Sequence, residues 1–435
     1  MASLLDRAKK VFAGNKFTRG PLQESWNLSD PRVPKFLLRG EGSRVFDEEG
    51  RSYVDYLCSF GATVLGYGDE RVEAAAIAAA RATGGQLLSC PTHYSVELAE
   101  RLVKLRPGAE WVLLAKNGSD VTTLARVAAR AATGRRGILR EAADGAPAYH
   151  GASPQWLGGR AGVLSEESHD HEGHYRYNDL ASVEAAIAKM GGGDSIAAIF
   201  VGAASYPYSD RTQEPTREFA RGLGEIAKRT GALLVLDEIR TNFRVGTPGS
   251  GGSWAEVGGA DARPPDLYCM CKAMANGHPI AALLGADGPA REGAADMTAT
   301  GTYWLAAPPM AAALATLDSL EENDGAVIRH MQDIGRALAE GIKTAASEAG
   351  LAITMSGPPS LPFLTFDEPG EVPHHRPLSE LYVVEMAGLG VLLHPHHHGY
   401  ISAAHTQADV DFTLGAARKA MEIVRAARDA AAASV

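Results

Sequence analysis

Short runs of consecutive apolar residues alternate with amphipathic segments through the middle of the chain. The clearest run covers residues 232–236 and directly follows Gly231. A strand that is apolar at every position is typical of a parallel sheet with both faces buried. Similar runs predict further strands at 111–115, 196–201, 266–270 and 281–285.

Helical periodicity fills the intervals between these runs. It predicts helices at 95–105, 119–133 and 215–230, the last with Pro215 near its first turn and Gly231 directly after its end. Alternating strands and helices predict an α/β fold, in which helices cover both faces of a mostly parallel sheet.

The two ends of the chain follow other patterns. Residues 1–40 are expected to form an arm that begins with a short helix, and 45–55 a hairpin that turns at Glu49 and Gly50. After Pro308 and Pro309 a separate C-terminal lobe is predicted. Its expected elements are a long helix at 310–348, strands at 351–355, 361–366 and 389–393, and a final helix at 409–432.

Composition excludes several classes of protein. The net charge of −10 and the lack of a basic run argue against nucleic acid as a partner. No apolar run reaches the length of a membrane span, and the N-terminus lacks the apolar core of a secretory signal. The four cysteines show no CxxC spacing, so neither a zinc site nor a disulfide framework is indicated and a cytoplasmic setting is expected.

Two chemically distinctive side chains follow neighbouring predicted strands. Asp237 and Glu238 come after the run at 232–236, and Lys272 comes after the strand at 266–270. Open α/β sheets bind ligands at the carboxyl ends of their strands. A carboxylate and a partly desolvated lysine at this edge suggest a lysine Schiff base to pyridoxal phosphate, with Asp237 on the pyridine nitrogen. Taken singly, Asp237 also fits a strand-end cap and Lys272 a surface lysine.

The segment Asn-Gly-Ser at 117–119 joins a predicted strand to a predicted helix. Backbone N–H groups and the helix dipole attract anions at such a junction, so Gly118 and Ser119 are candidate phosphate ligands. Ser119 would also be the N-cap of the helix, which is the simpler interpretation. Asp120 is expected to point away from a bound phosphate.

Two weaker segments fit the same cofactor. Tyr149, in Tyr-His-Gly, would stack on a flat ring, and Thr302, in Gly-Thr, would donate to a phosphate. Each also fits an ordinary loop residue.

Histidines gather at 169–174 and at 394–398. Neither group has the i, i+4 spacing of a helical zinc motif or the frame of a zinc finger, so no metal site is predicted. These side chains are expected in solvated loops or at the rim of a substrate pocket.

Taken together and in order, these segments resemble the class III aminotransferases, which use pyridoxal phosphate, and most of all the glutamate-1-semialdehyde 2,1-aminomutase-like branch. The resemblance runs from about Pro34 to the C-terminal helix. The segments that carry it are Phe-Asp-Glu-Glu-Gly-Arg-Ser-Tyr-Val-Asp-Tyr at 46–56, Asn-Gly-Ser-Asp at 117–120, Tyr-His-Gly at 149–151, Asp-Glu-Ile-Arg-Thr-Asn-Phe-Arg at 237–244, Cys-Lys-Ala-Met-Ala-Asn-Gly-His-Pro-Ile at 271–280, Gly-Thr-Tyr at 301–303 and Tyr-Ile-Ser-Ala-Ala-His-Thr at 400–406.

The resemblance implies fold type I, with a mostly parallel sheet of the seven-stranded type in a large domain and a smaller α+β C-terminal domain. It divides the chain into an N-terminal arm and hairpin at 1–65 (part of the small domain), a large cofactor-binding domain at 66–310 and a small domain at 311–435. It also implies a homodimer with shared active sites.

The resemblance also assigns roles to residues. Lys272 would bind the cofactor covalently and move the proton, Asp237 would hold the pyridine nitrogen, and Ile239 and Tyr149 would pack on the two faces of the ring. Gly118 and Ser119 would bind the phosphate, joined by Thr302 of the neighbouring subunit. Arg32 is a candidate clamp for a substrate carboxylate, or else a surface arginine. Ser59 and Phe60 are expected to line the substrate pocket.

Three departures from the family pattern concern the substrate. Gly202 and Ala203 stand where the family usually has Glu-Pro, Asn242 replaces a glycine, and 306–308 replaces a Gly-Asn-Pro-like segment. We expect these positions near the substrate side of the site. The sequence therefore leaves the substrate and its stereochemistry open.

The expected activity is transfer of an amino group between an amino acid or amino aldehyde and a keto acid. An intramolecular aminomutase and a racemase remain alternatives on the same scaffold. A non-catalytic ligand-binding protein is a more distant alternative, because both Lys272 and Asp237 are present.

Overall fold

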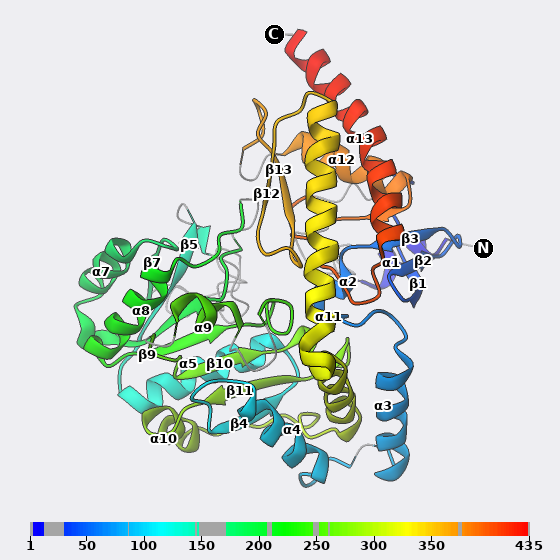
Figure 1. Ribbon diagram of the computed structural model, residues 1–435. Coiled ribbons are helices and arrows are strands. Elements are labelled where there is room, and N and C mark those ends of the chain that lie inside the picture. The colour runs from blue at the N-terminus through cyan, green and yellow to red at the C-terminus, as the bar shows by residue number, and fades with distance from the viewer. Residues whose placement is uncertain are drawn as a thin grey trace.

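The computed structural model of the chain describes residues 3–12, 30–85, 87–143, 146–147, 171–206, 211–246, 252–259, 262–372 and 376–433. Its largest feature is a sheet in the order β4-β11-β10-β9-β8-β5-β6, with β7 on β5 as well (Figure 1). The strands are β4 (Trp111–Ala115), β5 (Gly137–Ala143), β6 (Ala146–Pro147), β7 (Glu172–Tyr175), β8 (Ile196–Gly202), β9 (Leu233–Asp237), β10 (Leu267–Met270) and β11 (Ala281–Gly285).

Most neighbours in this sheet are parallel. The pairs β10–β9, β9–β8, β8–β5 and β5–β7 are parallel, whereas β11 is antiparallel to both of its neighbours and the two-residue β6 is antiparallel to β5. The predicted mostly parallel sheet is therefore confirmed. Without β6, the sheet has the seven strands that fold type I implies.

The unbroken apolar run in β9 is explained by two hydrophobic cores. Leu234 and Leu236 pack in one core with residues of α8, whereas Leu233 and Val235 pack in the other with residues of α5. Successive side chains of a strand point to opposite faces, so both faces of this sheet are covered. Every position from Leu233 to Leu236 is buried as a result.

Helices lie on both faces of the sheet (Figure 1). They are α4 (His93–Lys104), α5 (Gly118–Thr133), α7 (Leu180–Lys189), α8 (Arg217–Thr230), α9 (Gly252–Gly258) and α10 (Pro289–Asp296). In α8, Thr216 is the N-cap and Gly231 ends the helix in the left-handed conformation. The glycine stop is as predicted, and Pro215 lies directly before the N-cap, near the first turn.

The two ends of the chain build one smaller part together. Its sheet has the order β1-β2-β3-β14, so a strand near the C-terminus extends the predicted N-terminal hairpin. The hairpin turns at Gly50 as expected. The elements of this part are α1 (Leu4–Val11), β1 (Leu37–Glu41), β2 (Arg44–Asp47), β3 (Ser52–Asp55), α2 (Cys58–Gly61), the later portion of α11 (Ala307–Glu348), the β12–β13 hairpin (Ile353–Ser356 and Phe363–Phe366), α12 (Pro377–Gly388), β14 (Val391–Leu392) and α13 (Gln407–Ala433). Helix α3 (Glu70–Ala82) packs instead against the start of α11, beside Tyr94 of α4.

The long helix α11 connects the two parts of the molecule (Figure 1). Its backbone leaves helical geometry at 322–325, so it consists of two helices joined by a kink. Helix α12 was not predicted, because its apolar residues form no one-sided stripe. Among the described residues, no helix is both long and apolar enough to cross a membrane.

Candidate active site

Asp237 and Lys272 come from the ends of two neighbouring parallel strands. Asp237 is the last residue of β9 and lies opposite Cys269 of β10. Lys272 follows β10 and begins the short 3₁₀ helix η5 (Lys272–Ala275), with a left-handed φ of 46°. Both residues are half-buried. The structure thus brings the two predicted catalytic residues to one edge of the sheet.

The ammonium group of Lys272 is held by a loop of the smaller part. Its Nζ donates a hydrogen bond of 2.6 Å to the carbonyl oxygen of Phe60. Phe60 belongs to α2, a turn in which Cys58, Ser59 and Phe60 all have left-handed φ values. Ser59 is exposed and Phe60 half-buried. The predicted pocket residue Phe60 therefore lies directly beside Lys272.

The adjacent carboxylates Asp237 and Glu238 have different surroundings. Glu238 is fully buried and accepts a hydrogen bond of 2.5 Å from Nε of Arg106. Burial raises the pKa of Glu238, and the charge of Arg106 opposes that rise. Asp237 accepts the N–H of Ile239 at 3.0 Å. Glu238 is thus part of a buried ion pair, and Asp237 is the carboxylate at the edge of the site.

Helix α5 begins directly after β4, at the predicted anion-binding turn. Asn117 is its N-cap and Gly118 its first residue, so the expectation that Ser119 is the N-cap is wrong. Ser119 lies exposed in the first turn. Asp120 turns back and accepts the N–H groups of Asn117 at 2.8 Å and Lys116 at 3.2 Å. The first turn of a helix of this length is suited to an anion.

Gly118 also brings the turn against the end of β9. A Cβ atom at this position would lie 2.8 Å from Cδ1 of Ile239, so the Ile239 side chain would have to shift to accommodate it. The glycine therefore allows Ile239 to contact the turn. The half-buried Ile239 is thus placed between the anion site and Asp237.

Histidines 394–398 form part of the smaller domain's interior. His394, His396, His397 and His398 are each less than 10% exposed, so the expectation of a solvated loop is wrong for this group. The ring of His397 lies 5.5 Å from that of Phe60, and His394 lies 6.3 Å from it. Burial lowers the pKa of His397 and of His398 well below its usual value. The neutral imidazole of His397 therefore lies beside Phe60.

The first histidine group is only partly described. His174 is exposed and His171 is half-buried, whereas His169 lies outside the described residues. Over the part of the chain that the structure describes, no three His, Cys, Asp or Glu side chains are arranged to hold a metal ion.

Three further predicted site residues have different outcomes. Arg32 forms ion pairs with Asp30 at 2.7 Å and Glu385 at 2.6 Å. Because Arg32 already pairs with two carboxylates, these contacts argue against a role as a substrate clamp and favour the alternative of a surface arginine. Thr302 is exposed in a turn, where its contact with a neighbouring subunit stays a prediction. Tyr149 lies outside the described residues.

The sequence interpretation missed two residues that organise the site. Asn242, which we expected near the substrate, is buried. Its Nδ2 donates a hydrogen bond of 2.8 Å to the carbonyl oxygen of Cys271. It therefore fixes the backbone next to Lys272. Arg244 is fully buried and donates to the carbonyl oxygens of Ile401, Gly61 and Thr63. Both residues lie in the 237–244 segment, but their hydrogen-bond partners are far away in the sequence, so a local sequence pattern does not reveal them.

Comparison with known proteins decides the family. The sequence profile described as aminotransferase class-III matches residues 27–398, most of the chain. This chain belongs to the class-III aminotransferase family. The predicted resemblance, the fold type and the cofactor are confirmed with it, so this class-III aminotransferase is a pyridoxal-phosphate-dependent enzyme.

Relatives of this class-III aminotransferase include transferases and mutases. It is 37% identical to the aminopentol aminotransferase of Sphingopyxis macrogoltabida, over 97% of this chain and 93% of that protein. It is 30% identical to a glutamate-1-semialdehyde 2,1-aminomutase of Desulfatibacillum aliphaticivorans, over 89% and 92%. The solved structure of the pyridoxal phosphate internal aldimine form of the FumI protein from Sphingopyxis sp. MTA144 superposes with a TM-score of 0.86, at 36% identity, covering 96% of this chain and 95% of that one.

The described residues of this class-III aminotransferase fit its cofactor. A helix start with the exposed Ser119 suits the phosphate, and Gly118 lets the Ile239 side chain pack closely against this turn. Asp237 suits a protonated pyridine nitrogen, and Ile239 supplies an apolar face between them. Lys272 is the lysine at the same edge.

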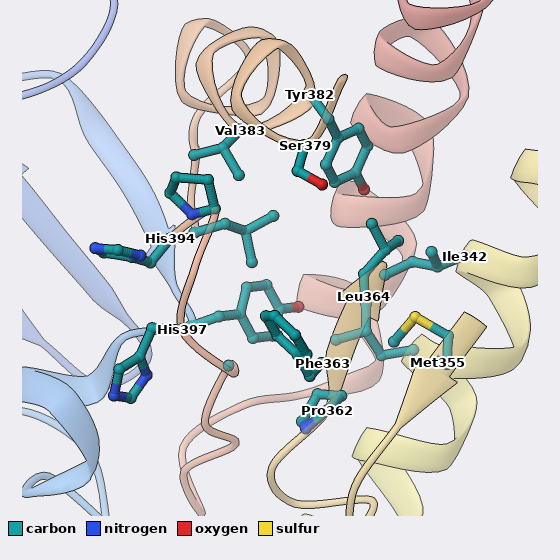
Figure 2. A pocket seen from close by; sticks show the side chains of 15 residues that line it. Ile342, Met355, Pro362, Phe363, Leu364, Ser379, Tyr382, Val383, His394 and His397 are labelled. Carbon is teal, nitrogen blue, oxygen red and sulfur yellow. The ribbon is translucent and has the colours of Figure 1, made fainter. Parts of the chain in front are cut away.

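A separate apolar cavity lies in the smaller part of this class-III aminotransferase (Figure 2). Ile342, Met355 and Leu364 line one side, and His394 and His397 lie on the other. The side chains at the end of the large sheet do not contribute to its lining. The cavity is therefore adjacent to the Phe60 loop but distinct from the cofactor site.

Proposed function

We propose that this enzyme transfers an amino group from one amine substrate to a separate keto acid, and that Lys272 and Asp237 are its central catalytic residues. The observation that carries the proposal is their position at the ends of the adjacent strands β9 and β10. The 37% identity to an aminopentol aminotransferase supports the transferase assignment.

Each residue has a defined task in this proposal. Pyridoxal phosphate, when bound, supplies an electron sink for the electrons of a broken Cα–H bond. Asp237 keeps a proton on the pyridine nitrogen by charge and hydrogen bonding. Lys272 would take the proton from the substrate Cα and deliver it to the cofactor carbon that is bonded to the amino nitrogen. The hydrogen bond from Nζ to the carbonyl oxygen of Phe60 orients the amine of Lys272 before it binds the cofactor.

Further residues would bind the cofactor and line the substrate side of the site. Gly118 and Ser119 would hold the phosphate through the first turn of α5, and Ile239 would pack on one ring face. The resemblance assigns Tyr149 to the other face, and Thr302 would reach the phosphate of a second subunit. Ser59 and Phe60 line the substrate side. We propose a homodimer in the cytoplasm, which agrees with the exposed Thr302 turn and the lack of paired cysteines.

The second candidate is an intramolecular aminomutase. Relatives at about 30% identity that carry this name favour it. Against it, Gly202 lies beside Asp237 on β8 where the family usually has a carboxylate, so the substrate side differs.

The two candidates are distinguished by supplying glutamate-1-semialdehyde alone. The transferase proposal predicts no 5-aminolevulinate, together with amine-dependent conversion of an added keto acid such as pyruvate. Formation of 5-aminolevulinate without any second substrate would instead establish the mutase.

A further inference from the structure

Asp55 lies beneath the loop that holds Lys272 and contacts three hydrogen-bond donors. It is 1% exposed at the end of β3. Its carboxylate accepts the N–H of Leu57 at 2.8 Å, the N–H of Cys58 at 3.1 Å and the hydroxyl of Tyr67 at 2.6 Å. Two of these donors begin the turn that ends in Phe60. One buried carboxylate thus fixes the start of the loop.

Tyr67 connects the same carboxylate to the tip of the loop. Its hydroxyl lies 3.2 Å from Oγ of Ser59 while it donates to Asp55. Ser59 therefore donates to Tyr67, and a continuous chain of hydrogen bonds runs from Ser59 to Asp55. The next residue, Phe60, accepts the hydrogen bond from Lys272.

The conformation of this loop requires such support. Cys58, Ser59 and Phe60 have φ values of 45°, 53° and 55°, a left-handed path that side chains with a Cβ disfavour. Gly61 follows at 84°, and a Cβ there would lie 2.2 Å from the ring of Tyr400. Strained backbone persists only where the surrounding structure fixes it.

The far side of the loop is held from the large domain. Arg244 donates to the carbonyl oxygens of Gly61 and Thr63, and Asn276 accepts the N–H of Leu65 at 2.8 Å. Asp55 and Tyr67 support the turn from the side of the smaller sheet, where Cys58 Sγ also donates to the carbonyl oxygen of Tyr400. Loss of Asp55 removes the acceptor at the start of the turn, and loss of the Tyr67 hydroxyl removes the hydrogen bond to Ser59 at its tip.

We propose that Asp55 and Tyr67 are positioning residues that place Lys272 by holding residues 58–60 in the left-handed turn. The inference rests on the proposed catalytic role of Lys272. Neither residue touches the reacting atoms; both act through the carbonyl oxygen of Phe60.

The arrangement also makes the site sensitive to pH. Burial raises the pKa of Asp55 to about 6, opposed by the Tyr67 and backbone hydrogen bonds. The other titratable or charged groups around it are Tyr67, Cys58, Arg244 and His405. Burial holds the first two neutral and lowers the pKa of His405 to about 4, so Asp55 is the group that titrates near pH 6. Below that pH it gains a proton and loses an acceptor for the loop.

The test compares D55N and Y67F with D47N and Y53F. Asp47 is a buried carboxylate that accepts from Tyr53, from two backbone N–H groups and from Nε of Arg51, but it holds the β2–β3 turn and not the Lys272 loop. The control pair therefore reproduces the loss of a buried hydrogen-bond network without the contact to Lys272.

Three readouts are measured on each variant. They are the pH midpoint of the visible absorption band of the holoenzyme, the pH profile of kcat for an amine and pyruvate, and hydrogen exchange at residues 57–61 in the chain without cofactor. D55N and Y67F should shift the absorption midpoint, lower kcat about ten-fold with little change in KM, and expose the amides of Leu57 and Cys58. D55N should also lose the acid limb near pH 6. D47N and Y53F should change none of these.

Wild-type midpoints and unchanged amide protection in both D55N and Y67F would overturn the proposal. Y67F removes a single hydroxyl, so it decides the question if D55N fails to fold. A wild-type chain that shows no lysine-bound cofactor band would refute the proposed function instead. The hydrogen-exchange comparison would then still report on the support of the loop.

Discussion

The proposed cofactor side and the proposed substrate side of this site are built from different kinds of structure. On the cofactor side, Asp237, Lys272 and Gly118 lie at strand ends and a helix start around one sheet. On the substrate side, Phe60 and His397 come from loops near opposite ends of the chain and meet only in the folded molecule. The first arrangement is fixed by regular backbone, whereas the second depends on side-chain contacts between distant segments.

This difference implies that the two sides respond differently to mutation. Changes at the strand ends should abolish chemistry on every substrate, because the cofactor serves all of them. Changes in the loops should alter the choice of substrate and leave the cofactor in place. The following variants test that division.

The largest effect is expected for Lys272→Ala. Loss of the covalent attachment and of the proton carrier should lower kcat by more than about 10⁵-fold. Steady-state turnover of an amine with pyruvate is the measurement, with the exposed Lys189→Ala as control. Residual turnover within about 100-fold of wild type would contradict the assigned role.

Asp237→Ala should have the next largest effect. Without the carboxylate the pyridine nitrogen loses its proton, and kcat should fall about 10³-fold while Lys272 still binds the cofactor. Asp287→Ala, an exposed carboxylate after β11, is the matched control. Near-normal kcat in Asp237→Ala would remove it from the mechanism.

Arg106→Leu should affect stability and not chemistry. It leaves the carboxylate of Glu238 buried without its partner, which typically costs about 3–5 kcal/mol. Urea unfolding measures the loss. Arg229→Leu removes an exposed ion pair and should cost less than about 1 kcal/mol. Equal costs for the two variants would show that Glu238 is not the buried structural carboxylate described here.

The smallest effect is expected for His397→Ala. Removing a ring that contacts Phe60 should change KM for the amine about ten-fold and leave the cofactor absorption unchanged, because the contact lies on the substrate side only. The exposed His174→Ala should change neither. An altered absorption band in His397→Ala would show that His397 also affects the cofactor, so the two sides would not be independent.

The same division explains what could be predicted from the sequence. The apolar run at 232–236 and the two acids that follow it predicted β9 and Asp237, because the end of a strand is a local feature of the sequence. A position at the strand end does not by itself distinguish Asp237 from Glu238, and the choice of Asp237 agrees with the ion pair that Arg106 forms with Glu238. The burial of His394–His398 and the contacts of Asn242 were missed because other elements of the fold determine them. A histidine-rich loop looks solvated until the helices that cover it are known.

Reductive trapping of the cofactor tests the central claim most directly. The holoenzyme is treated with borohydride and digested, and the modified peptide is identified by mass spectrometry. We expect one pyridoxyl adduct, on Lys272. Lys116 is a demanding competitor, because it precedes the phosphate turn and burial lowers its pKa. An adduct on Lys116, or none on Lys272, would contradict the account.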